Sequence, residues 1–187
     1  MTVFSKWRIK DVIIATFIAI LAGLIFSGFD WIYNLIYVPL AGTGWAPLVG
    51  EAMDGLWFMA GPIAFMVTRL PGSALFTEII GALIESAIGG TFGMAGFLAG
   101  FAQGLGSEIA FGSFKYKKIN FKILTYAAVL TTITSFIASL FVNSYLNLKF
   151  NVLVIYFLVR LASALIFSLI LVYLIWQIFQ RSKVKKV

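Results

Sequence analysis

The sequence contains no cysteine and no histidine among its 187 residues. Without cysteine it can form no disulfide and offers no thiolate for catalysis or metal binding. Without histidine it lacks the commonest general base and metal ligand, so serine–histidine and cysteine–histidine catalytic arrangements are excluded. No GxxxxGK[ST] phosphate loop is present, and no spacing of carboxylates argues for a metal site. We therefore predict a protein that is not an enzyme and has no cofactor or bound metal.

Charged residues are also scarce, at 11% of the chain, whereas 61% of the residues are hydrophobic. A soluble domain usually has about a quarter charged residues, so this chain has too little polar surface to cover a water-soluble particle. We predict an integral membrane protein with one membrane domain over residues 1–187. The net charge of +7 does not indicate nucleic-acid binding, because lysines and arginines cluster at the ends of apolar runs, as membrane topology requires.

Six apolar segments predict an all-α bundle of six transmembrane helices, at residues 12–29, 51–68, 73–88, 92–114, 123–144 and 152–179. The first is interpreted as a span rather than a cleaved signal peptide, because more membrane sequence follows it. Residues 30–50 are rich in aromatic residues, Gly and Pro and contain no Lys or Arg. We predict an ordered aromatic loop that caps a cavity. An aromatic belt at the membrane surface is the alternative.

The distribution of basic residues predicts the orientation of the bundle. If the N-terminus is cytoplasmic and six spans alternate, the inside holds 12 of the 14 basic residues, whereas the outside holds only Lys149. Arg160 lies within the last span. Both termini are therefore predicted to be cytoplasmic and the loop at 30–50 extracellular. The inside set is Lys6, Arg8, Lys10, Arg69, Lys115, Lys117, Lys118, Lys122, Arg181, Lys183, Lys185 and Lys186.

With this orientation, most polar groups of the spans converge on the outer half of the bundle. Glu51, Asp54 and Trp57 share one helix face because they are three residues apart. Glu85 reaches the same level from the third span, and Arg160 lies roughly 12 Å below the start of the sixth. Three carboxylates against one arginine predict an acidic cavity for a small organic cation, on which aromatic rings can stack. The predicted substrate-binding residues are Asp54, Trp57, Glu85, Glu51, Gln103, Arg160 and Trp31.

Three points remain open from the residues alone. Glu51 either contacts the ligand or sits at the water boundary, where charge is cheap. Arg160 either pairs with Glu85 or binds the ligand. Small residues recur at four-residue spacing in the first span, at Ala15, Ala19 and Gly23. They allow close approach of another helix, which is either a helix of the same chain or one of a partner subunit.

Several segments together resemble one known family. They are the Trp7–Asp11 lead, the run from Asp54 to Pro62, the turn Arg69–Leu–Pro–Gly72, the helix from Glu78 to Glu85, and the run from Gln103 to Glu108 before a basic loop. Over essentially its whole length, the chain resembles the substrate-binding S components of energy-coupling factor (ECF) vitamin transporters. Among these it is similar to the YkoE family, which handles thiamine or its hydroxymethylpyrimidine precursor.

The resemblance implies six helices with cytoplasmic termini in the bacterial plasma membrane, and an outward-facing pocket under the loop after the first span. It implies as partners a transmembrane T component, which docks on an Ala-x-x-x-Ala face of the first span, and two cytoplasmic ATPases. Ala15 and Ala19 have that spacing, and Gly23 continues it. The expected function is capture of thiamine or hydroxymethylpyrimidine for ATP-driven uptake, and the positive charge of thiamine suits the acidic cavity. The alternative is a stand-alone cation channel or secondary transporter.

Overall fold

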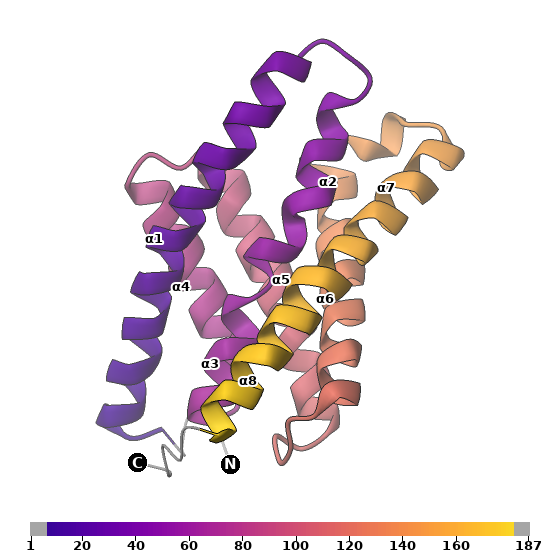
Figure 1. Cartoon of the computed structure of the whole chain (residues 1–187). Helices are drawn as coiled ribbons and strands as arrows, with labels where there is room; N and C mark the ends of the chain where they lie inside the picture. Colours follow the sequence, from indigo (N-terminus) through magenta and orange to yellow (C-terminus); the bar gives the residue numbers. More distant parts are fainter. Residues whose placement is uncertain (1–6, 182–187) are drawn as a thin grey trace.

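The structure is a computed structural model that describes residues 7–181. Within this range every regular element is a helix, which confirms the predicted all-helical class for the described part of the chain (Figure 1). Three stretches are long and apolar enough to cross a membrane, namely Ile9–Leu40, Phe121–Val142 and Phe150–Arg181. The elements are α1 (Ile9–Leu40), α2 (Ala46–Trp57), α3 (Ala60–Thr68), α4 (Ser73–Ala87), α5 (Gly93–Ser113), α6 (Phe121–Val142), η2 (Tyr145–Asn147), α7 (Phe150–Ala164), η3 (Leu165–Leu171) and α8 (Val172–Arg181).

Helix α1 is much longer than the predicted first span. It has 32 residues, or about 48 Å at 1.5 Å per residue, against roughly 30 Å for the hydrocarbon core of a bilayer. The prediction of a loop over residues 30–50 is therefore wrong except at residues 41–45, because α1 continues to Leu40 and α2 begins at Ala46. The aromatic residues were mistaken for a loop signal. The helix meets no proline before Pro39, in its last turn.

The predicted helix over residues 51–68 is divided into α2 and α3 at residues 58 and 59. Two serines of the C-terminal rod, which is the continuous helical stretch formed by α7, η3 and α8, bind the backbone beside this break. Ser163 Oγ accepts the N–H of Gly55 at 3.0 Å, and Ser168 Oγ donates to the carbonyl of Phe58 at 3.2 Å. A break in an apolar bundle is tolerated where neighbouring side chains satisfy the backbone in this way. The rod itself runs from α7 through the π-helical segment η3 into α8.

The small residues of α1 pack inside the molecule, against α4. The side chains of Ala15 and Ala19 have no exposed area. A Cβ on Gly23 would lie 2.7 Å from the carbonyl oxygen of Gly81 in α4. Of the two readings left open by the sequence, packing within the chain is therefore the one found. The prediction that Ala15, Ala19 and Gly23 form a partner-docking face is wrong for this structure, because Ala15 and Ala19 have no exposed area and Gly23 packs against α4.

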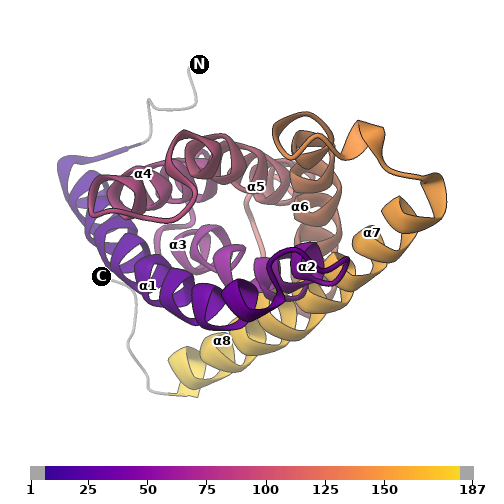
Figure 2. The ribbon, with the colours of Figure 1, turned by 90° about the horizontal axis from the view of Figure 1, so that it is seen from above.

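Seen from above, the longer helices surround α3 (Figure 2). A large apolar cluster fills the end of the bundle where α3 and α5 end and α6 begins. It includes Phe58, Phe65, Phe111, Leu124 and Val172. This end is therefore closed by packed side chains.

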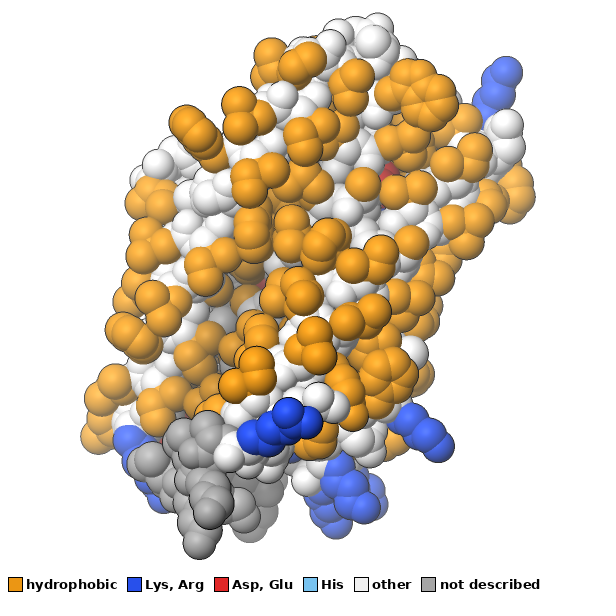
Figure 3. Space-filling view, viewed as in Figure 1, with side chains coloured by type: hydrophobic (Ala, Val, Ile, Leu, Met, Phe, Trp, Pro, Cys, Tyr) orange, Lys and Arg blue, Asp and Glu red, His pale blue; other side chains and the backbone are white. Residues whose placement is uncertain are grey.

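Basic residues gather at the closed end. The eight described lysines and arginines of the predicted inside set lie at the start of α1, after α3, between α5 and α6, in the first turn of α6, and at the end of α8. Figure 3 shows blue side chains along the lower end, below a flank covered by hydrophobic groups, and one blue side chain at the upper right. The other members of the set, Lys6, Lys183, Lys185 and Lys186, lie outside the described residues.

Candidate functional site

A cavity lies at the end of the bundle where α1 passes into α2. Helices α1, α2, α4, α5, α6 and α7 all contribute to its wall. A neighbouring hollow shares Tyr33, Asp54 and Arg160 with it and extends to Tyr37 and Pro47 beside the α1–α2 turn, so that the two are continuous. The polar lining residues of the cavity are Asp54, Glu85, Gln103, Ser135, Ser139, Asn143 and Arg160, and the aromatic ones are Phe26, Tyr33, Trp57 and Phe92.

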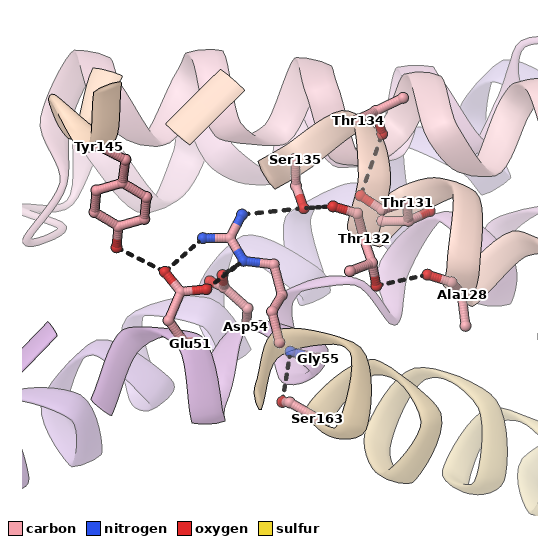
Figure 4. A network of polar contacts seen from close by, with 11 residues as sticks. Glu51, Asp54, Gly55, Ala128, Thr131, Thr132, Thr134, Ser135, Tyr145 and Ser163 are labelled. Atoms are coloured by element: carbon pink, nitrogen blue, oxygen red, sulfur yellow. Dashed lines mark hydrogen bonds and ion pairs between the residues drawn. The ribbon is translucent and has the colours of Figure 1, made fainter. Parts of the chain in front are cut away.

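A buried ion-pair network forms one side of the cavity (Figure 4). Arg160 on α7 donates from Nε to Glu51 Oε2 at 2.7 Å and from Nη2 to Glu51 Oε1 at 2.9 Å. Tyr145 donates its hydroxyl to Glu51 Oε1 at 2.6 Å, and Arg160 Nη1 donates to Ser135 Oγ at 3.3 Å. Glu51 and Arg160 are only 1% and 3% exposed. Two charges this deeply buried are tolerated because each is paired and hydrogen-bonded.

Asp54 lies at the boundary between this network and the cavity. Its Oδ2 is 2.7 Å from Arg160 Nε, and 23% of its side chain is exposed, against 1% for Glu51. Asp54 therefore presents a carboxylate to the cavity while Glu51 stays behind it. Arg160 pairs with Glu51 and Asp54 and forms no recorded ion pair with Glu85 within the described residues, so the reading of Arg160 as the partner of Glu85 is wrong.

A second acidic position lies across the cavity, on α4. Glu85 accepts the indole N–H of Trp57 at 2.8 Å. Trp57 in turn packs edge-to-face with Phe29 and Phe92, with ring centroids 5.7 and 6.0 Å apart. The indole is thus fixed in orientation by one hydrogen bond and two aromatic contacts, and it forms a rigid apolar surface beside a carboxylate.

Helix α1 carries a row of aromatic and acidic residues, most of them in the segment that was predicted to be a loop. Tyr33 stacks on Tyr37 with centroids 5.0 Å apart and contacts Phe92 at 5.2 Å. Asp30, one turn away, accepts the backbone N–H of Thr91 through Oδ2 at 2.8 Å and thereby ties α1 to the α4–α5 turn. Phe26, Asp30, Tyr33 and Tyr37 follow helical spacing, so a helical reading of residues 30–40 could have predicted them as one face.

Six of the seven predicted substrate-binding residues lie around this space. Asp54, Trp57, Glu85, Gln103 and Arg160 line the cavity itself, and Glu51 lines the adjoining hollow. Trp31 does not belong with them: its side chain is 74% exposed and lines neither space. Its neighbour Tyr33, on the opposite face of α1, takes the place that was predicted for Trp31.

Residues that were not among the predicted site also line it. Tyr33 and Phe92 form its aromatic wall, and Tyr145 in η2 bonds the buried Glu51. Ser135, Ser139 and Asn143 add hydroxyl and amide groups from α6. Among the described residues, no three acidic side chains lie close enough together to hold a metal ion.

An apolar helical bundle with a polar, aromatic-walled cavity near one end is the architecture of a membrane protein that binds a small molecule. The family model described as "ABC-type cobalt transport system, permease component" matches residues 10–134. YkoE of Bacillus subtilis (strain 168), whose name describes an HMP/thiamine permease protein, is 33% identical over 159 residues, which are 85% of this chain and 77% of YkoE.

A solved structure, described as the crystal structure of an S-component of ECF transporter, matches with a TM-score of 0.85. It is 30% identical in sequence, and the match covers 96% of this chain and 88% of that one. The chain therefore belongs to the YkoE-like family of ECF transporter S components. Proteins of this family are transporter subunits and not enzymes, as predicted.

Proposed function

We propose that this chain captures thiamine or its hydroxymethylpyrimidine precursor in the cavity described above, as the substrate-binding subunit of an ECF importer. The observation that carries the proposal is the composition of the cavity. Three carboxylates, of Glu51, Asp54 and Glu85, surround it against the single guanidinium of Arg160. An uncompensated negative charge in an apolar bundle favours a cationic ligand. The similarity to a relative named as an HMP/thiamine permease supports the same ligand class.

The two parts of thiamine suit different parts of the wall. The thiazolium ring carries a permanent positive charge, which Asp54 and Glu85 attract. The aminopyrimidine is flat and carries hydrogen-bonding groups, for which Trp57 and Tyr33 offer aromatic faces and Gln103 an amide. Aromatic faces also attract cations directly. Hydroxymethylpyrimidine would use the second set of contacts without the first.

The proposal includes the orientation of the chain. We place both termini in the cytoplasm of a bacterium and the cavity at the outer surface of the plasma membrane. The gathering of basic residues at the closed end supports this orientation. Six crossings result if α2 and α3 count as one broken crossing and α7, η3 and α8 as one rod. The start of α1 and the end of α8 then both lie on the inner side (Figure 1).

We propose a T component and two cytoplasmic ATPases as the partners that release the ligand inside. The chain itself lacks a phosphate-binding loop of the GxxxxGK[ST] type, so the energy for uptake has to come from other subunits. The T component needs an exposed surface, and the buried stripe at Ala15 and Ala19 does not provide one.

Binding by the purified protein in detergent tests the proposal. We expect thiamine to quench part of the tryptophan fluorescence, because Trp57 lines the cavity, and to raise the thermal unfolding midpoint. Asp54→Asn and Glu85→Gln should each weaken thiamine binding by about tenfold or more, since each removes a charge facing the cation. Glu78→Gln is the matched control, because Glu78 is fully buried between α3 and α4 and does not line the cavity.

Two outcomes would contradict the proposal. The first is parent protein that binds neither thiamine nor the pyrimidine by fluorescence or thermal shift. The second is unchanged affinity in both cavity variants, which would place the ligand elsewhere. Cation flux through liposomes that contain this chain alone would instead favour a self-sufficient channel or secondary transporter.

A further inference from the structure

The guanidinium of Arg160 binds the carboxylates of Glu51 and Asp54 in different ways. Its Nε lies 2.7 Å both from Glu51 Oε2 and from Asp54 Oδ2, although Nε carries a single hydrogen. That hydrogen bonds to Glu51, and Nη2 adds a second bond to the same carboxylate. Within the described residues, Asp54 accepts no hydrogen bond from a side chain. Arg160 therefore attracts Asp54 through charge alone, whereas it binds Glu51 through both charge and two hydrogen bonds.

Arg160 and Glu51 form a fixed unit that does not depend on Asp54. The hydroxyl of Tyr145 orients the Glu51 carboxylate at 2.6 Å, and Ser135 accepts from the far nitrogen of Arg160 at 3.3 Å. The guanidinium also lies over the ring of Phe136, with its carbon 5.3 Å from the ring centroid. These contacts can keep Arg160 in place when its ion pair with Asp54 is lost.

We propose that Arg160 competes with the cationic ligand for the carboxylate of Asp54. A cation that binds Asp54 replaces Arg160 there, and Arg160 stays paired with Glu51. This inference rests on the proposed function, because it assumes that the cavity binds a cation. It makes Arg160 a specificity-determining residue and Glu51 a positioning residue. A neutral pyrimidine gains nothing from the release of Asp54, so only a ligand with its own positive charge offsets the lost ion pair.

Rescue between variants tests the competition. Glu51→Gln leaves Asp54 as the one carboxylate beside Arg160, so thiamine binding should weaken by about fivefold or more, a typical coupling between two sites. Adding Arg160→Gln removes the competitor and should restore the affinity to the parental value or better. In the Asp54→Asn background the same Arg160→Gln change should restore nothing, because the carboxylate that binds the cation is missing. Affinity for hydroxymethylpyrimidine should change little throughout.

The outcomes separate the inference from the proposed function. If the parent binds thiamine and Arg160→Gln fails to rescue Glu51→Gln, or weakens binding further, then Arg160 contacts the ligand and the inference is overturned while the proposed function stands. If the parent does not bind thiamine, the proposed function fails. Thermal unfolding of every variant identifies losses that arise from misfolding.

A measurement on the unaltered chain covers the case in which the variants do not fold. The chain has four arginines, Arg8, Arg69, Arg160 and Arg181, and only Arg160 lies at the cavity. With 15N-labelled arginine, saturating thiamine should shift one of the four Nε–H resonances, and hydroxymethylpyrimidine should leave that resonance in place. Thiamine binding without such a shift, or an equal shift with both ligands, overturns the inference.

Discussion

Glu78 illustrates at the scale of a single residue how this bundle accommodates a carboxyl group in its interior. The side chain has no exposed area, and its Oε1 accepts the backbone N–H of Gly61 at 2.7 Å. Gly61 is in the first turn of α3, directly after the break from α2, where N–H groups have no partner within their own helix. Glu78 thus supplies from α4 the acceptor that the broken crossing lacks.

Substitution of Glu78 should therefore affect stability according to whether an acceptor remains. Glu78→Ala leaves the N–H of Gly61 unpaired and opens a void, which should lower stability by about 1–3 kcal/mol or more. Glu78→Gln keeps a carbonyl oxygen at the same position and should stay much closer to the parent. Thermal unfolding in detergent measures both, and equal destabilisation by the two substitutions would contradict the assigned hydrogen bond.

Single residues of the cavity were predictable where their type is unusual for a membrane span. A carboxylate or a guanidinium in an apolar helix is costly and so indicates a site; in this way Asp54, Glu85 and Arg160 were found. Aromatic residues are common in spans and at membrane surfaces, so type alone did not separate Tyr33, which lines the cavity, from Trp31, which is 74% exposed. That choice depends on the rotation of α1 about its own axis.

Among the elements, α1 and α4 show why small residues decide which helices touch. Gly23 lets the two backbones approach so closely that a Cβ on it would lie 2.7 Å from the carbonyl oxygen of Gly81. Without a strong hydrophobic force between helices in lipid, such close packing is a main source of helix association. The α1–α4 interface is therefore a structural contact that substitutions should damage.

Two glycines of α1 provide a matched test of this contact. An alanine at Gly23 would meet the Gly81 carbonyl and the Ile84 side chain at 2.7 Å, whereas an alanine at Gly28 would meet nothing within 4 Å. Gly23→Ala should destabilise the protein by about 1–3 kcal/mol, as overpacked interiors do, and Gly28→Ala should be neutral or slightly stabilising. Thermal unfolding compares the two. A Gly23→Ala protein as stable as Gly28→Ala would mean that α1 does not pack on α4 in this register.

The break between α2 and α3 is an element-scale feature that the prediction of one continuous span over residues 51–68 missed, although Pro62 has no N–H to bond the carbonyl of Phe58. Gly61 and Pro62 lie after the break, in the first turn of α3, and a continuous apolar run crosses it. What stabilises the break comes from residues distant in the chain, namely Glu78, Ser163 and Ser168. A pattern within one segment cannot reveal partners that only the tertiary structure supplies.

For the molecule as a whole, the separation of charge along the bundle is the dominant feature. Basic side chains gather at one end, and the acidic cavity lies toward the other. Lysine and arginine are retained on the cytoplasmic side during insertion. The arrangement therefore favours the proposed orientation, in which the cavity faces the outside.

The absence of cysteine makes this orientation directly measurable. A single cysteine at Thr43, exposed in the α1–α2 turn, should react with a membrane-impermeant maleimide in intact cells. A single cysteine at Lys117, exposed between α5 and α6, should react only after permeabilisation. The parent protein is the unlabelled control. The reverse pattern would invert the proposed topology, and equal labelling of both positions in intact cells would contradict the odd number of crossings that the proposed topology places between them.

The sequence by itself determined the class of this protein, the asymmetry of its charge and the main polar residues that line its cavity. These follow from composition and from the cost of charge in lipid, which act on each residue whatever its neighbours. Tertiary structure alone decided that α1 runs through most of the predicted loop, that Ala15 and Ala19 are buried, and that Arg160 pairs with Glu51 and Asp54 rather than with Glu85. Those outcomes depend on how helices rotate and pack against one another, which brings together residues such as Glu51 and Arg160 that are 109 positions apart.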